Sequence, residues 1–250
     1  MTPPHGLCTV AWIDLSYALA YGVGMSTTSA EKGSQLQIQH FVNNEPDRLA
    51  TAISAQVRAL GARRPVFAWQ SPLKADDYQE YKDRRFLKAV GAGRLHQALT
   101  AFWPDNGPVW DALATFTSDA GPGVLLVEGK AHDGELSSSC KAKDSRSREA
   151  IEKALSHTRE VLGATGSIDL WMNGYYQAAN RLAHLVWLRE QGVDAWLVTL
   201  LFTDDRSNKP TSEKDMRGAV AEMHGHLGLR VGIPEQAAEV YLEAAELRQS

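Results

Sequence analysis

The sequence contains little cysteine, and this scarcity excludes several classes of protein. Its two cysteines, Cys8 and Cys140, lie far apart and have no partners at the spacing of zinc ligands. Neither a disulfide framework nor a structural zinc site fits such a pattern. A reducing compartment suits it, and we therefore expect a cytoplasmic protein.

A long hydrophobic run is also missing. The most apolar early stretch, residues 7–25, is interrupted by Asp14 and has no basic leader before it. A membrane span needs about 20 consecutive apolar residues, and a secretory signal begins with positive charge. The sequence therefore predicts a soluble protein without membrane contact.

The chain lacks the excess positive charge that covers many nucleic-acid-binding proteins. Its formal net charge is -4 at pH 7, so the whole surface cannot serve as a basic track for phosphates. A local cluster must supply any phosphate contacts, and solvated surface charge is the alternative interpretation of each candidate. The candidates are Arg84, Arg85, Arg94, Lys141, Lys143, Arg146 and Arg148.

What is present is enough hydrophobic sequence for one large core. With 250 residues, 44% of them hydrophobic, the chain needs no disulfides or metal to fold. We expect a main domain over residues 76–250, preceded by an N-terminal extension over residues 1–75 that packs on it. In the extension a short strand is expected over 7–13 and another over 66–69. Between them a helix is expected that Asp47 caps, with apolar positions at helical spacing at Leu49, Ile53, Val57 and Leu60.

Beyond residue 75 the apolar spacing alternates between helical and strand-like periods. Helices are expected over 76–90, 95–102, 147–162, 174–191, 213–227 and 235–248, and strands over 109–116, 124–131 and 195–202. The last strand is apolar throughout, as in strands buried on both faces. A helix followed by such a strand implies a crossover connection, so we predict an α/β protein with three layers, α/β/α, and a mixed sheet.

Two of these strands form a hairpin joined by the turn-rich segment 117–123. If the turn is centred between residues 119 and 120, Asp111 lies opposite Glu128. Opposed β-carbons in an antiparallel pair are roughly 4.5 to 5.5 Å apart, and like charges there destabilise the sheet. Lys130 shares their face because side chains alternate along a strand. Three charged groups are thus expected on one surface.

This combination suits hydrolysis of a phosphodiester. Magnesium typically binds one or two carboxylates together with water and a substrate phosphate, and the reaction needs a positioned water and neutralised phosphate charge. Asp111 and Glu128 are the candidate ligands of Mg²⁺ or Mn²⁺, with the carbonyl of Gly129 as a further ligand. Lys130 would orient the attacking water and counter the developing negative charge.

Asp111 followed on the next strand by Glu128-Gly129-Lys130 resembles the motif of the PD-(D/E)xK, or restriction-endonuclease-like, nuclease superfamily. Trp110 stands where the motif has proline. The strings WDAL, LLVEGKAH and YYQAANRLAH are similar to those of uncharacterised bacterial proteins assigned to this superfamily. The resemblance covers about residues 95–205 and implies a restriction-endonuclease-like core that cleaves DNA with a divalent metal.

The resemblance also implies supporting residues. Some members place a glutamine on the helix after the hairpin, which corresponds to Gln177, although Arg181 stands where those members have an aromatic residue. Many members carry an acidic metal ligand on the helix before the hairpin, which corresponds to Glu80. The acidic residues that compete with Glu80 for this role are Asp76, Asp77 and Asp83. A solvated helix face also explains the polar stripe that Gln177 and Arg181 form with His184.

Two interpretations stay open from the sequence. An intact set of two acids and a lysine favours a nuclease, whereas the low overall basicity favours a catalytically silent nuclease-like fold that binds nucleic acid or protein. An exposed Glu–Lys surface pair is the bland alternative, but the apolar surroundings in LLVEGKA are typical of a central strand. A homodimer that cuts both strands of DNA fits the sequence as well as a monomer does.

Overall fold

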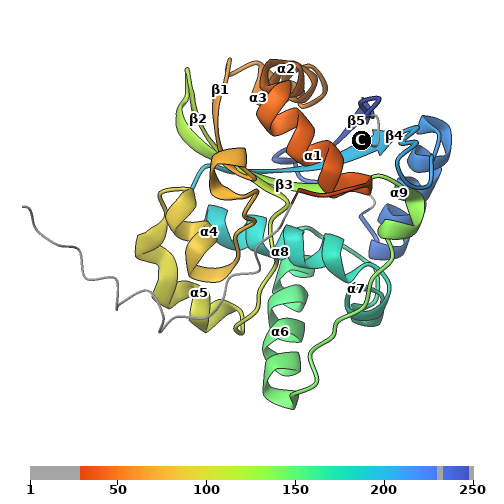
Figure 1. The fold of residues 1–250 in the computed structure, drawn as a ribbon. Coiled ribbons are helices and arrows are strands. Elements are labelled where there is room, and N and C mark those ends of the chain that lie inside the picture. The colour runs from red at the N-terminus through yellow and green to blue at the C-terminus, as the bar shows by residue number, and fades with distance from the viewer. Residues whose placement is uncertain (1–28, 230–232, 248–250) are drawn as a thin grey trace, which may run out of the picture.

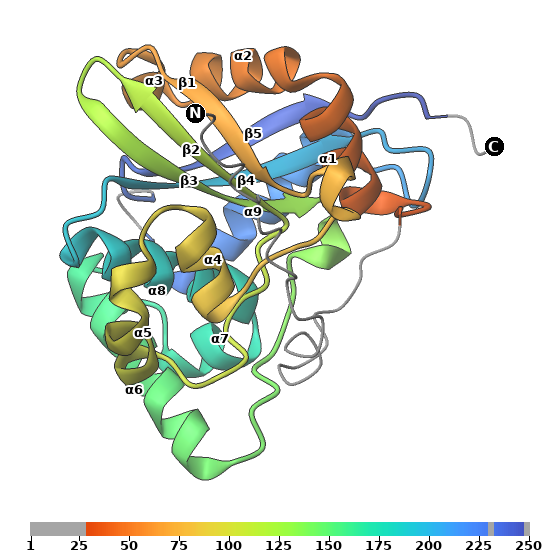
Figure 2. The same cartoon turned by 60° about the vertical axis from the view of Figure 1, so that its left-hand side comes forward.

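The computed structural model describes residues 29–229 and 233–247 (Figures 1 and 2). The strand expected over 7–13 lies outside these residues. At the centre is a five-stranded sheet in which strands follow one another in sequence order. The strands are β1 (Val66–Ser71), β2 (Ala112–Ser118), β3 (Gly121–Lys130), β4 (Ala195–Thr203) and β5 (Ala237–Glu243). The expected α/β fold with a mixed sheet is confirmed, because β1, β2 and β3 are antiparallel whereas β3, β4 and β5 are parallel.

Helices cover both faces of this sheet. Figure 1 shows α1 (Gly33–Asn44), α2 (Pro46–Gln56) and α3 (Arg58–Gly61) above the sheet. The helices of the other face are α4 (Asp83–Ala89), α5 (His96–Phe102), α6 (Ser145–Val161), α7 (Ile168–Asn173), α8 (Tyr176–Glu190) and α9 (Glu213–Leu227). The short 3-10 helices are η2 (Lys74–Asp76), η3 (Gly93–Leu95) and η4 (Asp133–Glu135).

Strand β3 separates two hydrophobic cores. Leu125 and Val127 belong to the core under α1 and α2, whereas Val124 and Leu126 belong to the core under α8. A strand buried on both faces is apolar throughout for this reason. The same alternation carries Glu128 and Lys130 together to the α8 side, and their common face is as expected from the sequence.

Gly129 lies on the opposite side of β3, against helix α1. A β-carbon at this position would lie 2.3 Å from Cδ1 of Ile38. Glycine therefore allows α1 to pack closely against the strand that carries the charged residues.

The described part of the first 75 residues, from residue 29 on, contributes to this same sheet. Strand β1 pairs with β2, and Leu49, Ile53, Val57 and Leu60, which the helical spacing picked out, are all buried in the second core. The cap assignment was wrong, because α2 begins at Pro46 and Asp47 lies inside its first turn. Helix α1 was not anticipated. The division of the chain at residue 75 stays a prediction.

The helix expected over 76–90 is wrong in its first half. Asp77 and Tyr78 have φ angles of 50° and 55°, and α4 begins only at Asp83. Between them Tyr81 forms a β-bridge with Trp110, because its carbonyl accepts the Trp110 N–H at 3.0 Å. Glu80 consequently lies outside any helix, contrary to the expectation.

The helix expected over 235–248 is also wrong, since this stretch contains strand β5. Its alanines, leucine and glutamates favour helix locally, but pairing along β4 overrides that preference. The helix expected over 213–227 is confirmed as α9. Helix α7 was missed, although Ser167 caps it by accepting the Leu170 N–H. No helix among the described residues combines the length and the hydrophobicity of a membrane span.

Candidate active site

The site begins at the hairpin, whose predicted register is confirmed. Ser118 pairs with Gly121 and Ala112 with Val127, so the turn consists of residues 119 and 120. The expected loop over 117–123 was too long, and the first strand starts at Ala112 rather than at residue 109. Continuing this register by one residue sets Asp111 beside Glu128.

Where the backbone hydrogen bonds between β2 and β3 end, the side chain of Asp111 accepts the next hydrogen bond from β3. The next hydrogen-bonded pair would join Trp110 to Gly129, but the Trp110 N–H donates to Tyr81 instead. The Gly129 N–H donates to Oδ2 of Asp111 at 2.7 Å. The carboxylate of Asp111 is thereby held against the backbone of the Glu-Gly-Lys segment.

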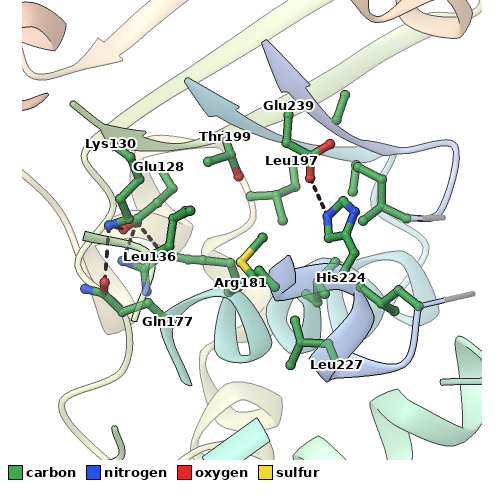
Figure 3. Close-up of a pocket in the computed structure, with 17 residues that line it drawn as sticks. Glu128, Lys130, Leu136, Gln177, Arg181, Leu197, Thr199, His224, Leu227 and Glu239 are labelled. Atoms are coloured by element: carbon green, nitrogen blue, oxygen red, sulfur yellow. Dashed lines mark hydrogen bonds and ion pairs between the residues drawn. The ribbon is translucent and has the colours of Figure 1, made fainter. Parts of the chain in front are cut away.

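Glu128 is 4% exposed and lies between two cations (Figure 3). Its Oε1 is 2.5 Å from Nζ of Lys130, and its Oε2 is 2.6 Å from Nη2 of Arg181. Burial alone raises the pKa of Glu128, but Arg181 and Lys130 together bring this pKa below its ordinary value. Glu128 is therefore ionised at neutral pH, because the two cations offset the cost of burying its charge.

Lys130 connects the hairpin to helix α8. Its Nζ also donates to Oε1 of Gln177 at 3.2 Å, and the Gln177 N–H donates to Ser138 Oγ at 2.8 Å. Burial lowers the pKa of Lys130, but the charges of Glu128 and Asp111 raise this pKa above its ordinary value. The lysine is an ammonium group at neutral pH, and so it can donate hydrogen bonds but cannot accept a proton.

Arg181 is the residue whose importance the sequence understated. Besides Glu128, it contacts the carbonyl of Val109 at 2.8 Å and Oδ1 of Asn180 at 2.7 Å, and its guanidinium lies 5.0 Å from the ring centroid of Trp110. The solvated-face interpretation of the polar stripe is wrong for Arg181 and His184, which are 5% and 1% exposed. The only hint in the sequence was that Arg181 follows Gln177 by one helical turn and so shares its face of α8.

Asp111 has no cationic side chain in direct contact among the residues that the structure describes. It keeps part of its surface open to solvent, yet burial and the nearby charge of Glu128 raise its pKa to about 8, against the opposing effect of Lys130. Burial above all, together with the charge of Glu128, makes ionisation of this carboxyl group unfavourable. Binding of an added cation would reverse that balance.

Glu80 lies at the margin of the site. Its Oε1 accepts a hydrogen bond from Gln35 at 3.0 Å, and burial and the charge of Glu128 raise its pKa. It interacts with the site through charge and makes no hydrogen bond with the predicted ligands. A group of three or more acidic, histidine or cysteine side chains placed to hold a metal is not found among the described residues.

The oxygen donors that are present suit a magnesium ion, which requires only one or two carboxylates. Asp111 and Glu128 supply them. The Val124 N–H donates to the carbonyl of Asp194, next to β4, so the even-numbered residues of β3 direct their backbone groups to β4. The odd-numbered residues direct theirs to β2, and the carbonyl of Gly129 therefore lies on the side of Asp111. Both oxygens of Glu128 already contact cations, so a metal must share this carboxylate with Lys130 or Arg181.

The charged residues lie between two hollows. Glu128 and Lys130 line a narrow cavity of about 40 Å³ between the sheet and helices α8 and α9 (Figure 3). Asp111 lines an open groove of about 540 Å³. Gln177 and Arg181 line both hollows. The polar residues that line only the groove include Asn106, Ser137, Ser138, Ser139, Lys141 and Asn180.

The predicted basic cluster is only partly gathered around this site. Lys141 lines the groove beside Asp111. Arg94 lines a different hollow, together with Phe67 of β1.

Comparison of the chain with models of protein families, with curated proteins and with solved structures finds no match.

Proposed function

We propose that this protein is a metal-dependent nuclease that hydrolyses phosphodiester bonds in DNA, built on a restriction-endonuclease-like core. One observation carries the proposal. At the end of β3 the side chains of Glu128 and Lys130 are in direct contact, and Asp111 accepts a hydrogen bond from the backbone of Gly129 between them. Two acids and a buried ammonium group at the meeting point of two hollows support a hydrolytic site better than they support a purely structural one.

The acidic residues would hold the ion. Asp111 and Glu128 are the carboxylate ligands in this proposal, the carbonyl of Gly129 is a backbone ligand, and Glu80 lies near enough to add negative charge. Bound Mg²⁺ or Mn²⁺ would polarise the phosphate and lower the pKa of a bound water. The raised pKa of Asp111 supports this role, because an ion restores its ionised form.

Lys130 would act on the phosphate as a charged hydrogen-bond donor. Its raised pKa keeps it protonated, and an ammonium group has three donors, of which Glu128 and Gln177 engage two. The remaining donor can orient a water or a non-bridging phosphate oxygen. Gln177 fixes the position of Lys130 and so supports this role, while Arg181 adds a second positive charge beside the phosphate.

A panel of labelled nucleic acids tests the activity. Single-stranded, double-stranded and branched DNA and the matching RNAs are incubated with Mg²⁺, Mn²⁺ or a chelator, using wild type, Lys130→Ala and the exposed control Lys153→Ala. We expect cleavage of DNA that needs the metal, is lost with Lys130→Ala and is kept with Lys153→Ala. Absence of cleavage on every substrate, or equal cleavage by Lys130→Ala, would overturn the proposal.

One observation favours the second candidate, a silent fold that binds nucleic acid or protein. Glu128 is already satisfied by Lys130 and Arg181, so its burial needs no metal. Thermal melting during a magnesium titration separates the candidates, because a ligand that binds only the folded state raises the melting temperature. A nuclease site predicts such a rise in wild type and its loss in Asp111→Asn, whereas a silent fold predicts no rise in either.

A further inference from the structure

The segment that leads from the groove into helix α6 is rich in positive charge. Residues 137–148 contain one acid, Asp144, and four cations, in a chain whose net charge is -4. The cations are Lys141, Lys143, Arg146 and Arg148. The carboxylate of Asp144 caps α6, where it accepts two backbone N–H groups. Residues 137–148 therefore form a basic strip on a protein that is negative as a whole.

The basic strip begins in the proposed active site and leads away from it. Ser137, Ser138, Ser139 and Lys141 line the groove together with Asp111. Figures 1 and 2 show the chain passing from the end of β3 along α7 to the tip of the molecule where α6 begins. A ligand that lies in the groove can therefore continue along the strip.

The side chains of the basic strip alternate between two sides before α6 begins. Cys140 and Ala142 are partly buried and pack against the core under α8. Their neighbours Lys141 and Lys143 are exposed, as expected when alternate residues of an extended chain face opposite ways. Two residues of such a chain span roughly 6.7 Å. This distance is similar to the spacing of neighbouring phosphates in an extended nucleic-acid strand.

Backbone hydrogen bonds hold the basic strip in place beside the groove. The N–H groups of Ser138 and Cys140 donate to carbonyls at the C-terminal end of α7, at 2.8 Å and 2.7 Å. Neither Lys141 nor Lys143 forms a hydrogen bond or an ion pair with another described residue. The two ammonium groups are thus fixed at their base and open to an anionic ligand.

We infer that Lys141 and Lys143 bind successive phosphates of a single DNA strand whose scissile phosphate lies at Asp111. This inference rests on the proposed nuclease function and narrows its substrate to single-stranded DNA. Arg146, which is exposed at the tip, extends the same line of contacts. Contacts to phosphate position a strand without reading its sequence, so the strip guides the strand into the groove whatever its bases are.

A single strand fits the groove and the basic strip better than a duplex does. The groove has a volume of about 540 Å³, within the range of roughly 300 to 1,000 Å³ that is typical of small-molecule pockets. It therefore admits a short stretch of one strand. The strip adds a single line of cations, which matches one sugar-phosphate backbone, whereas a duplex presents two.

The experiment measures by fluorescence anisotropy how a labelled single strand, and the same sequence as a duplex, bind over a range of salt concentrations. Full-length Asp111→Asn protein is used, so that neither DNA is cleaved. Each phosphate contact of a single strand contributes about -0.7 to the slope of log K against log salt. Lys143→Ala should therefore reduce the slope by about 0.7 and weaken binding about fivefold at about 0.1 M salt. Adding Lys141→Ala should double the change in slope, whereas Lys143→Arg should keep the binding of the parent protein.

Lys88→Ala is the matched control. Lys88 is an exposed lysine of α4, and the end of this helix borders the hollow at the start of β3, away from the groove. The control should leave the slope unchanged. A single strand whose binding does not respond to Lys143→Ala, an equal response to Lys88→Ala, or tighter binding of the duplex would overturn the inference and leave the nuclease proposal standing. No binding of either DNA would overturn both.

Discussion

Replacing Asp111 by asparagine should stabilise the metal-free protein at neutral pH. The pKa of Asp111 is raised from 3.8 to about 8 by burial and by Glu128, so the folded state holds this proton more tightly than the unfolded state. For a carboxyl group with a raised pKa, the full stability is present below pH 3.8 and is lost as the pH rises towards 8. Asparagine cannot ionise, and it escapes this loss.

The size of the effect follows from the pKa difference. At pH 7 the interval is 7 − 3.8, or about 3 pKa units, which corresponds to about 4 kcal/mol at 1.36 kcal/mol per unit. This is an upper bound, because Asp111 is partly open to solvent and the new amide group must find its own partners. We expect a net gain of about 1 to 3 kcal/mol, or several degrees in melting temperature. The gain should grow by up to about 1.4 kcal/mol per pH unit between pH 5 and 7, and more slowly as the pH nears 8.

Urea unfolding in the presence of a chelator measures this gain. Wild type, Asp111→Asn and Asp105→Asn, an exposed control, are compared at pH 5 and at pH 7.5. We expect the Asp111→Asn curve to move to higher urea, with a larger shift at pH 7.5 and no shift for the control. An Asp111→Asn protein that is no more stable than wild type, with a difference that does not change with pH, would refute it.

Three further predictions concern side chains around the site. Arg181→Gln leaves Glu128 with one cation and should lower the free energy of unfolding, measured in urea, by about 3 kcal/mol. Adding Glu128→Gln should recover part of this loss, and additive effects of the two substitutions would count against the pairing. Burial lowers the pKa of His184 from 6.5 to about 3. The stability that depends on neutral His184 should be full above pH 6.5 and fall by up to about 1.4 kcal/mol per pH unit as the pH drops towards 3. His184→Phe should flatten this dependence in acid unfolding curves, and an unchanged slope would contradict the prediction. Gly129→Ala should destabilise the protein by about 1 to 3 kcal/mol in thermal melting because of Ile38, and a neutral effect would show that α1 gives way easily.

The hairpin could be predicted from the sequence because its information is local. Turn residues and the alternation along LLVEGK fix which side chains face each other, and the pairing of Ser118 with Gly121 follows from them. The buried strand β4 was recognisable for a similar reason, since its apolar run is uninterrupted.

Other features depend on contacts between distant parts of the chain. Strand β5 has a helix-favouring sequence and owes its conformation to pairing with β4. Arg181 contacts Glu128 across 53 positions of sequence, so its burial could not be read from its own helix. Glu80 was placed on a helix because the bridge between Tyr81 and Trp110 leaves no local pattern.

The rate of metal-dependent DNA cleavage by Glu128→Gln, measured beside the exposed control Glu149→Gln, tests the central claim most directly. Glutamine keeps the size of the side chain and removes the charge that two cations and the proposed metal share. We expect a rate lowered at least about a hundredfold for Glu128→Gln and an unchanged rate for Glu149→Gln. Equal rates for the two variants, or no cleavage by the wild type, would contradict it.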